Sequence, residues 1–356
     1  IINESNIIGK GVMGEITTEN VSYFKLLRIT GNSRSKNYLD INNLVKSYKK
    51  GSPLIKKLNF SVKKGEIISF IGESGSGKTT LLKCIAGLEK INDGQIILNS
   101  LVLNDDRVFI KPQKRKIGFI FQDYPLFPHL SLIDNITFNL DKSFLKNLPF
   151  MLNLTGLENL VSRFPHQLSG GEQQRACIAR SLIREPDLLL MDEPFSNLDS
   201  SIKGSMIDEI YKILKQTKTT TILVTHDIND SLNISDRILV FKAGVLQQYA
   251  DPVKIYCEPV NCYCAKVLGG LNKIVVNGKV SYIRPENIRV VKKSDFKVLV
   301  EKCYFQGRDF KVKGSIENEP CFFTSKNPIK INSFIYIDFE ANDLMFFDSL
   351  CESFFQ

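Results

Sequence analysis

The 356-residue sequence contains no run of 18 or more apolar residues, which excludes a membrane-spanning helix. Its start lacks the charged, apolar and small-residue pattern of a secretory signal, so we expect a protein that is not secreted. Internal repeats and low-complexity segments are also missing. With 43% hydrophobic and 24% charged residues, the composition excludes a disordered, collagen-like or mucin-like chain and indicates two or three globular domains.

The eight cysteines are scattered over a long chain, which predicts reduced thiols in a cytosol. Three of them, Cys257, Cys262 and Cys264, fall within eight residues. Their spacing matches no standard zinc pattern and no histidine lies nearby. We therefore expect buried or idle thiols rather than a metal site.

The net charge of +9 raises the question of an acidic partner such as nucleic acid, phosphate or an anionic lipid surface. From Pro285 to Gln356, however, 10 basic residues stand against 11 acidic ones. Upstream of Pro285 the basic excess is spread along the chain instead of forming one block. This distribution argues against a nucleic-acid partner.

Changes in the residue pattern along the chain predict three segments. Residues 1–37 start with Ile, have their first Met at Met13 and show no sustained periodicity, so we expect an unstructured extension, with a regulatory arm as the alternative. Residues 38–270 alternate strand-like and helix-like patterns. Residues 271–356 contain short β-branched and aromatic runs separated by turn residues, which predicts a small β-barrel or sandwich.

A glycine-rich loop follows the apolar run Ile67–Ile71 and precedes a helical pattern over Thr79–Ala86. The loop, from Gly72 to Thr79, matches the G-x-x-x-x-G-K-[ST] phosphate-binding pattern. Its glycines let successive backbone N–H groups turn toward phosphates, and the helix adds its positive N-terminal end. Lys78 is then expected to reach the β- and γ-phosphates, and the Thr79 hydroxyl to bind Mg²⁺.

Two adjacent acids, Asp192 and Glu193, follow the apolar run Leu188–Met191. This pattern predicts a buried strand with carboxylates at its C-terminal tip, the edge at which parallel sheets bind ligands. On its own the pattern is common, but it is the expected counterpart of a phosphate loop. We expect Asp192 to hold Mg²⁺, directly or through water, and Glu193 to polarise the attacking water.

A second anion-binding pattern, Ser169-Gly170-Gly171, precedes the helix-like stretch Ala176–Leu182. A chain with one phosphate loop has no obvious need for a second phosphate cradle. The need arises if two chains stack head to tail and share each site.

In this order the motifs resemble those of the ATP-binding subunits of ABC transporters, over about Tyr38 to Gly270. The resemblance implies an α/β P-loop NTPase (ABC ATPase) domain with a small helical subdomain, ATP and Mg²⁺ as cofactors, and a head-to-tail dimer with a second copy of itself. It implies a γ-phosphate sensor at His226, after the strand-like run Thr221–Val224, and a Q-loop residue at Gln122.

The resemblance thus assigns catalysis to Glu193, His226 and Gln122, and metal binding to Thr79, Gln122 and Asp192. The nucleotide-binding residues that it implies come from an adenine-stacking aromatic residue, the phosphate loop, the signature motif and the D-loop: Tyr48; Gly72, Glu73, Ser74, Gly75, Ser76, Gly77, Lys78, Thr79 and Thr80; Ser169, Gly170, Gly171 and Glu172; and Asp199.

Each isolated side chain also has a structural alternative. Tyr48 could pack on the surface, Asp199 could cap a helix, and His226, one of only three histidines, could be a buried structural residue. Gln122 alone would carry no signal. Their order around the phosphate loop favours the functional interpretation in each case.

The stretch Phe121–Leu130 resembles importers of iron(III), polyamines, sulfate and maltose, and Arg163–Gln167 is similar to the iron(III) and polyamine types. Tyr282–Ile288 resembles the start of the OB/TOBE-like β-domain of such importers.

The resemblance implies a peripheral ATPase on the cytoplasmic face of the inner membrane. Its partners would be membrane permease subunits, touched by the Phe127–Phe138 face, and, indirectly, an extracytoplasmic solute-binding protein. Iron(III) or a related small solute is the expected cargo, a polyamine (spermidine or putrescine) is the alternative, and a soluble ABC ATPase is the less favoured one.

Overall fold

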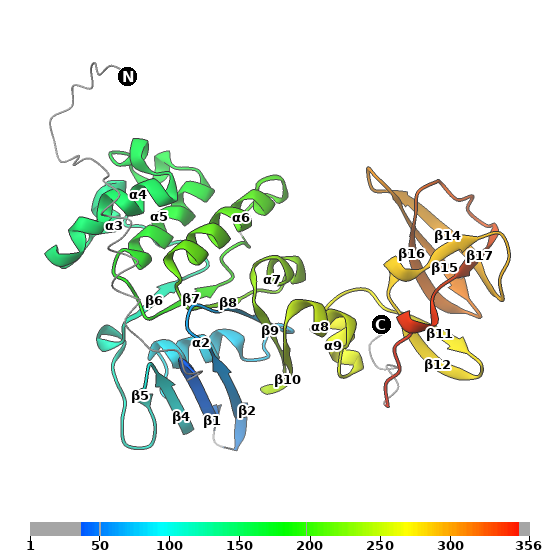
Figure 1. Ribbon diagram of the computed structural model, residues 1–356, viewed down its shortest axis with the longest axis horizontal. Coiled ribbons are helices and arrows are strands. Elements are labelled where there is room, and N and C mark those ends of the chain that lie inside the picture. The colour runs from blue at the N-terminus through cyan, green and yellow to red at the C-terminus, as the bar shows by residue number, and fades with distance from the viewer. Residues whose placement is uncertain (1–36, 50, 197, 349–356) are drawn as a thin grey trace, which may run out of the picture. The chain divides into compact units, whose positions relative to one another are not determined.

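The computed structural model describes residues 37–49, 51–196 and 198–348. Of the predicted extension over residues 1–37, only Asn37 belongs to this described part. Contacts within the chain define two compact units (Figure 1). The first extends to Phe70 and contains Ser74–Asp236 and Ala243–Val245, and the second contains Ile71–Glu73, Arg237–Lys242 and the chain from Leu246 onward. The predicted boundary between residues 270 and 271 stays a prediction.

An antiparallel sheet in the first unit contains two long strands, β1 and β2, whose buried side chains pack into the core. Its four strands follow the order β2-β1-β4-β5. Irregular register between β1 and β2 bends the pair, with shifts between Ile41 and Leu44 and again toward Lys49. The strands are β1 (Leu39–Lys49), β2 (Ser52–Val62), β4 (Asp93–Leu98) and β5 (Leu101–Asn104).

Four further strands of the first unit are adjacent and parallel in the order β3-β8-β7-β6. Every residue of β3 and β8 is buried, as are the first four of β7. Such unbroken apolar runs are typical of parallel strands covered on both faces, and their C-terminal ends meet at one edge. The strands are β3 (Ile67–Ile71), β6 (Ile117–Ile120), β7 (Leu188–Asp192) and β8 (Thr221–Val224).

Helices cover this sheet on both sides, with α2 on one side of β6 and β7 and α5 on the other (Figure 1). A core of buried side chains from α3, α4, α5 and α6 joins the predicted small helical subdomain to the strands. The helices are α2 (Lys78–Ala86), α3 (Leu132–Thr137), α4 (Leu148–Thr155), α5 (Gly170–Leu182), α6 (Ser200–Thr217) and α7 (Ile228–Ile234). Short 3₁₀ helices span Pro112–Lys114, Lys142–Asn147, Glu158–Leu160 and Pro165–Gln167.

The second unit begins with neighbouring strands β9 (Arg237–Lys242) and β10 (Val245–Ala250) and the short helices α8 (Pro252–Cys257) and α9 (Cys262–Val267). Antiparallel sheets follow, one of two strands and one of five in the order β13-β17-β14-β15-β16. Their inner faces share one apolar core. The strands are β11 (Asn272–Val276), β12 (Lys279–Ile283), β13 (Arg289–Val291), β14 (Phe296–Phe305), β15 (Phe310–Ile316), β16 (Glu319–Ser325) and β17 (Phe334–Asp338), with 3₁₀ helices at Pro285–Asn287 and Ala341–Asp343.

The predicted fold class is confirmed: an α/β phosphate-loop domain with a small helical part is followed by a small all-β region. In β16, Pro320 and Cys321 interrupt the run of β-branched and aromatic residues that is typical of a strand.

Candidate nucleotide-binding site

The phosphate loop leads from β3 into α2 through residues that adopt left-handed backbone angles. Gly75 has a φ of 78° and Gly77, the N-cap of α2, a φ of 106°. A side chain at either position would be strained, which explains glycine there. Lys78, the first residue of α2, is buried, and its Nζ lies 3.4 Å from Ser76 Oγ. The helix N-terminus and a buried ammonium group therefore lie at one place, which suits an anion.

A pocket of about 200 Å³ opens at this loop. It brings together residues that are far apart in the sequence, since Glu193 lines it beside the loop and α2. Among the described residues, the lining is formed by Leu54, Ser74, Gly75, Gly77, Lys78, Thr79, Thr80 and Glu193. The predicted residues Gly72, Glu73 and Ser76 belong to the same loop but not to this lining.

Thr79 and Asp192, two predicted metal ligands, are in direct contact. Thr79 Oγ1 donates a hydrogen bond of 3.0 Å to Asp192 Oδ1. Burial raises the pKa of the Asp192 carboxyl, and the Thr79 hydrogen bond opposes that rise. A hydroxyl and a carboxylate oxygen are the hard ligands that Mg²⁺ prefers, with water and phosphate oxygens completing an octahedron. The residues present thus fit a magnesium site.

Glu193 and His226 meet at the ends of neighbouring strands β7 and β8. His226 Nδ1 lies 3.4 Å from Glu193 Oε2, and the His226 side chain is 63% exposed. Glu193 has a φ of 47°, a left-handed angle that is uncommon for a residue with a side chain. Strained backbone of this kind concentrates at functional sites, so the geometry agrees with the predicted catalytic role, which stays a prediction.

Gln122 and Tyr48 are exposed side chains that do not line the pocket described above. Gln122 follows β6 by two residues. Tyr48 is 60% exposed on β1, and the ammonium group of Lys46 lies 4.8 Å from its ring centroid. An exposed aromatic ring can stack on a purine base. Both roles stay predictions.

The signature residues form the N-terminus of α5. Ser169 is the N-cap: its Oγ accepts from the Glu172 N–H at 3.3 Å, while Glu172 Oε2 accepts from the Ser169 N–H at 2.7 Å. This capping box lowers the pKa of the Glu172 carboxyl, chiefly through the Ser169 N–H. Ser169 and Gly170 are exposed, and none of the four predicted signature residues lines the phosphate-loop pocket.

Asp199 is the N-cap of α6 and is exposed, and its side chain makes no capping hydrogen bond. Four residues later, Lys203 connects this helix to the segment after His226. Its Nζ lies 2.6 Å from Asp227 Oδ2 and 2.8 Å from Asp230 Oδ1. Lys203 could not be identified from the sequence, because a single lysine in a helix carries no pattern.

Tyr124 and Gln174 were also missed. Both donate hydrogen bonds to the main-chain carbonyl of Pro194, the residue after Glu193. Tyr124 lies two residues after Gln122, and Gln174 lies on α5. No local spacing connects these positions, which are 70 and 20 residues from Pro194.

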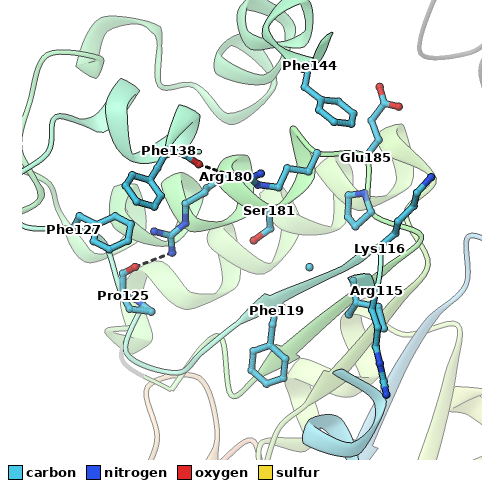
Figure 2. Close-up of a pocket in the computed structure, with 14 residues that line it drawn as sticks. Arg115, Lys116, Phe119, Pro125, Phe127, Phe138, Phe144, Arg180, Ser181 and Glu185 are labelled. Carbon is cyan, nitrogen blue, oxygen red and sulfur yellow. Dashed lines mark hydrogen bonds between the residues drawn. The ribbon is translucent and has the colours of Figure 1, made fainter. Parts of the chain in front are cut away.

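A second pocket, of about 720 Å³, lies between the edge strand β6, the C-terminal part of α5 and the helical subdomain. Figure 2 shows Phe127, Phe138 and Phe119 around it, with Arg180 among them. The rings of Phe127 and Phe138 have centroids 4.5 Å apart. Arg180 is fixed by donating to the Pro125 carbonyl at 2.7 Å. The predicted Phe127–Phe138 face thus forms part of an apolar hollow with basic groups in its wall.

The cysteines outside these sites differ in state. Cys257 and Cys264 are free thiols, and Cys264 is buried. Cys262 is disulfide-bonded, so the expectation of reduced thiols is wrong at this position. In the described ranges, no helix has the length and apolarity needed to cross a membrane.

Comparison with known proteins gives a consistent result. The model of the ABC transporter family matches residues 55–196. The chain is 40% identical over 253 residues to a spermidine/putrescine import ATP-binding protein of Clostridium novyi, covering 68% of this chain and 70% of that protein. It is 35% identical over 272 residues to an Fe(3+) ions import ATP-binding protein of Escherichia coli O157:H7, covering 74% and 76%. Among solved structures, the chain resembles a dimeric ATP-binding cassette in a post-hydrolysis state bound to ADP and Pi. The TM-score is 0.51 and the sequence identity is 32%, and the match covers 60% of this chain and 98% of that chain.

Proposed function

The chain belongs to the ABC transporter family of import ATP-binding proteins, and from this premise we propose that its phosphate-loop pocket turns ATP hydrolysis into import of a small solute. Members of this family are ATPases. The observation that carries the proposal is the Thr79–Asp192 hydrogen bond, because it joins the phosphate loop to the acid that ends β7. Thr79 lines the pocket and Asp192 does not, so this hydrogen bond is what connects the proposed metal-binding acid to the proposed anion-binding loop.

In the proposed reaction, the loop N–H groups and Lys78 bind the β- and γ-phosphates of ATP. Thr79 and Asp192 hold Mg²⁺, with Gln122 as a further ligand, and the bound ion neutralises charge on the phosphates. Positioning and charge neutralisation supply most of the rate enhancement in phosphoryl transfer. Tyr48 stacks on the adenine from its exposed place on β1.

Glu193 is the proposed general base. Its carboxylate lines the pocket and lies next to the imidazole of His226. In this position the carboxylate can accept a proton from the attacking water, and the imidazole can sense the γ-phosphate. His226 is largely exposed, so it can contact a nucleotide without a change in the core.

A second copy of the chain completes each site in this proposal. Ser169 and Gly170 are exposed at the N-terminus of α5, which suits an anion, yet they do not line the phosphate-loop pocket of their own chain. A head-to-tail pair would place Ser169–Glu172 and Asp199 of one copy against the nucleotide of the other. The dimeric cassette among the similar structures supports this arrangement.

The pocket of Phe127 and Phe138 is the proposed docking site for a cytoplasmic segment of a membrane permease. Its lining is largely apolar, with Arg180 and Arg184 hydrogen-bonded to neighbouring main-chain carbonyls. A short amphipathic segment fits such a hollow, by packing apolar residues on the rings. Docking there would hold the chain at the cytoplasmic face of the inner membrane as a peripheral protein.

For the cargo we propose iron(III), delivered to the permease by an extracytoplasmic solute-binding protein. The relative named for Fe(3+) import supports it. The relative with 40% identity is named for spermidine/putrescine import, and this favours a polyamine as the second candidate. The pocket residues contact only nucleotide in either case, so the partners select the cargo.

The test is to purify the full tagged chain from gently solubilised membranes and to identify the proteins that accompany it by mass spectrometry. We expect a polytopic permease together with a solute-binding protein. Calorimetry of that binding protein with iron(III) and with spermidine then separates the two cargo candidates. Recovery of the chain only from the soluble fraction, with ribosomes or nucleic acid, would contradict the transport proposal and leave the ATPase site in place.

A further inference from the structure

The carbonyl oxygen of Pro194 accepts hydrogen bonds from two side chains that come from separate parts of the first unit. Gln174 Nε2 donates to it at 2.9 Å, and the hydroxyl of Tyr124 donates to the same oxygen. Gln174 lies on α5, five residues after Ser169, and Tyr124 lies two residues after Gln122. One main-chain atom therefore connects the signature helix, the loop after β6 and the residue that follows Glu193.

These contacts are shielded from water. Gln174 is 0% exposed and Tyr124 is 5% exposed, and Pro194 is buried. Burial raises the pKa of the Tyr124 phenol, so its hydroxyl stays protonated and remains a donor. Two donors on one buried carbonyl satisfy both of its lone pairs and leave that peptide little freedom to rotate.

The backbone of Glu193 is held on both sides. Its N–H donates to the Val224 carbonyl at 2.9 Å, and its carbonyl accepts from Ser196 Oγ at 2.9 Å. Its φ of 47° is costly for a residue with a side chain and persists only if the surroundings impose it. Tyr124 has a similar φ, 44°, so the donor and the residue it supports are both in the left-handed region.

We propose that Tyr124 and Gln174 are positioning residues that fix the carboxylate of Glu193 through the Pro194 carbonyl. The inference depends on the proposed role of Glu193 as the base. Neither side chain is expected to touch the nucleotide, because neither lines the phosphate-loop pocket. A shift of the loop after Gln122, or of α5, would move the Pro194 peptide and with it the base.

The alternative is that both side chains only fill the core. The two interpretations differ in what a missing hydrogen bond does. If Tyr124 only packs, its ring matters and its hydroxyl does not affect turnover. If it positions Glu193, removal of the hydroxyl alone lowers kcat, because a small displacement of a catalytic group reduces the rate steeply.

The test uses Tyr124→Phe and Gln174→Met in the full chain. Both changes roughly keep the side-chain volume and remove the group that donates to the Pro194 carbonyl. The Oε1 atom of Gln174 is buried without a hydrogen-bond partner, so Gln174→Met also removes an unsatisfied acceptor, which limits its effect on stability. Tyr211→Phe and Gln216→Met, on exposed positions of α6, are the matched controls.

We expect each core variant to lower kcat for ATP about tenfold, with KM changed less than about twofold, since binding groups are untouched. The melting temperature should stay close to that of the wild type, and both controls should keep full activity. Unchanged kcat in both core variants would overturn the inference, as would losses of kcat that follow losses of melting temperature. Glu193→Gln distinguishes failure of the base assignment from failure of the positioning role. If Glu193→Gln retains turnover, the assignment of Glu193 as the base fails. If Glu193→Gln abolishes turnover while Tyr124→Phe and Gln174→Met do not lower it, only the positioning role fails.

Discussion

Lys203 on α6 and Asp230 on α7 form a salt bridge of 2.8 Å, and the Asp230 side chain is only 3% exposed. Asp230 also accepts a hydrogen bond of 3.0 Å from Thr225 Oγ1, and Lys203 binds Asp227 at 2.6 Å. The helix that begins after Asp199 is thus attached to the segment that carries His226. Two loops predicted to act on the nucleotide are coupled by one lysine.

Lys203→Met should destabilise the first unit by about 3 kcal/mol near neutral pH, because it leaves a buried carboxylate without its counter-charge. Burial already raises the pKa of Asp230, and loss of Lys203 should raise it further. A carboxyl whose pKa is higher in the folded than in the unfolded state costs stability as the pH rises above about 4. Urea unfolding at pH 5 and 7.5 should therefore show the larger loss at pH 7.5.

Lys212→Met, at an exposed position of the same helix, is the control for this change. The double variant Lys203→Met/Asp230→Asn should recover part of the stability, since the buried charge is gone. If Lys203→Met and the wild type have the same free energy of unfolding at pH 7.5, the ion pair between Lys203 and Asp230 does not stabilise the fold.

Glu193→Gln should abolish turnover while ATP binding persists. The amide keeps the size of the side chain but cannot accept a proton, so we expect kcat to fall about a hundredfold or more. We expect hydrolysis to be the step that separates the two copies of the proposed dimer, so the variant should accumulate as a dimer with ATP and Mg²⁺. Steady-state kinetics and size-exclusion chromatography with and without ATP measure both effects.

Lys78→Ala provides the contrast, since it removes the buried ammonium group beside the loop and should abolish nucleotide binding or turnover. A Glu193→Gln variant that hydrolyses ATP near the wild-type rate would mean that another group is the base. Unchanged activity of Lys78→Ala would contradict the phosphate-loop interpretation itself.

Phe138→Glu should weaken attachment to the permease without affecting hydrolysis by the isolated chain. Phe138 is exposed, lines the larger pocket and contacts Phe127. A charge in the centre of an apolar docking site should reduce the co-purified permease about tenfold or more, as for aromatic residues at interface centres. The ATPase rate of the purified chain should change less than about twofold.

Leu101→Glu, at an exposed position on β5 outside the pocket, is the control for this substitution. It should leave permease recovery unchanged. If Phe138→Glu and Leu101→Glu recover the same amount of permease as wild type, the permease docks elsewhere.

The parts of the site that the sequence could predict are the contiguous ones. The loop from Gly72 to Thr79 carries its own glycines, lysine and hydroxyl, and each role follows from local backbone geometry. Asp192 and Glu193 were found because a buried strand is visible as an apolar run. Such signals depend only on neighbours in the chain.

Tyr124, Gln174 and Lys203 could not be predicted in this way. Their partners lie 70, 20 and 24–27 residues away, and only the folded sheet brings them together. Each is also an ordinary residue for its local element: a tyrosine in a loop, and a glutamine and a lysine in helices. The left-handed φ of Glu193 is equally invisible in a sequence, because it results from hydrogen bonds made by other segments.

Gly244→Ala should destabilise the first unit and weaken ATP binding together. Gly244 has a φ of 81°, and a Cβ there would lie 2.0 Å from the Leu54 carbonyl oxygen. Its N–H donates to the Ser76 carbonyl of the phosphate loop at 3.1 Å, and its own carbonyl accepts from Lys56 N–H at 2.8 Å. The strained angle and the clash should together cost about 2 kcal/mol or more, and the displaced Ser76 should raise the Kd for ATP.

Gly278→Ala separates the two causes of this loss. Gly278 has a φ of 70°, and a Cβ at this position would meet no other atom within 4 Å, so alanine there meets only the backbone strain, about 1 kcal/mol. Urea unfolding and calorimetric titration with ATP should find the larger stability loss, and the only change in Kd, in Gly244→Ala. If both variants lose the same stability and bind ATP alike, the close approach of Gly244 to Leu54 and Ser76 does not support the loop.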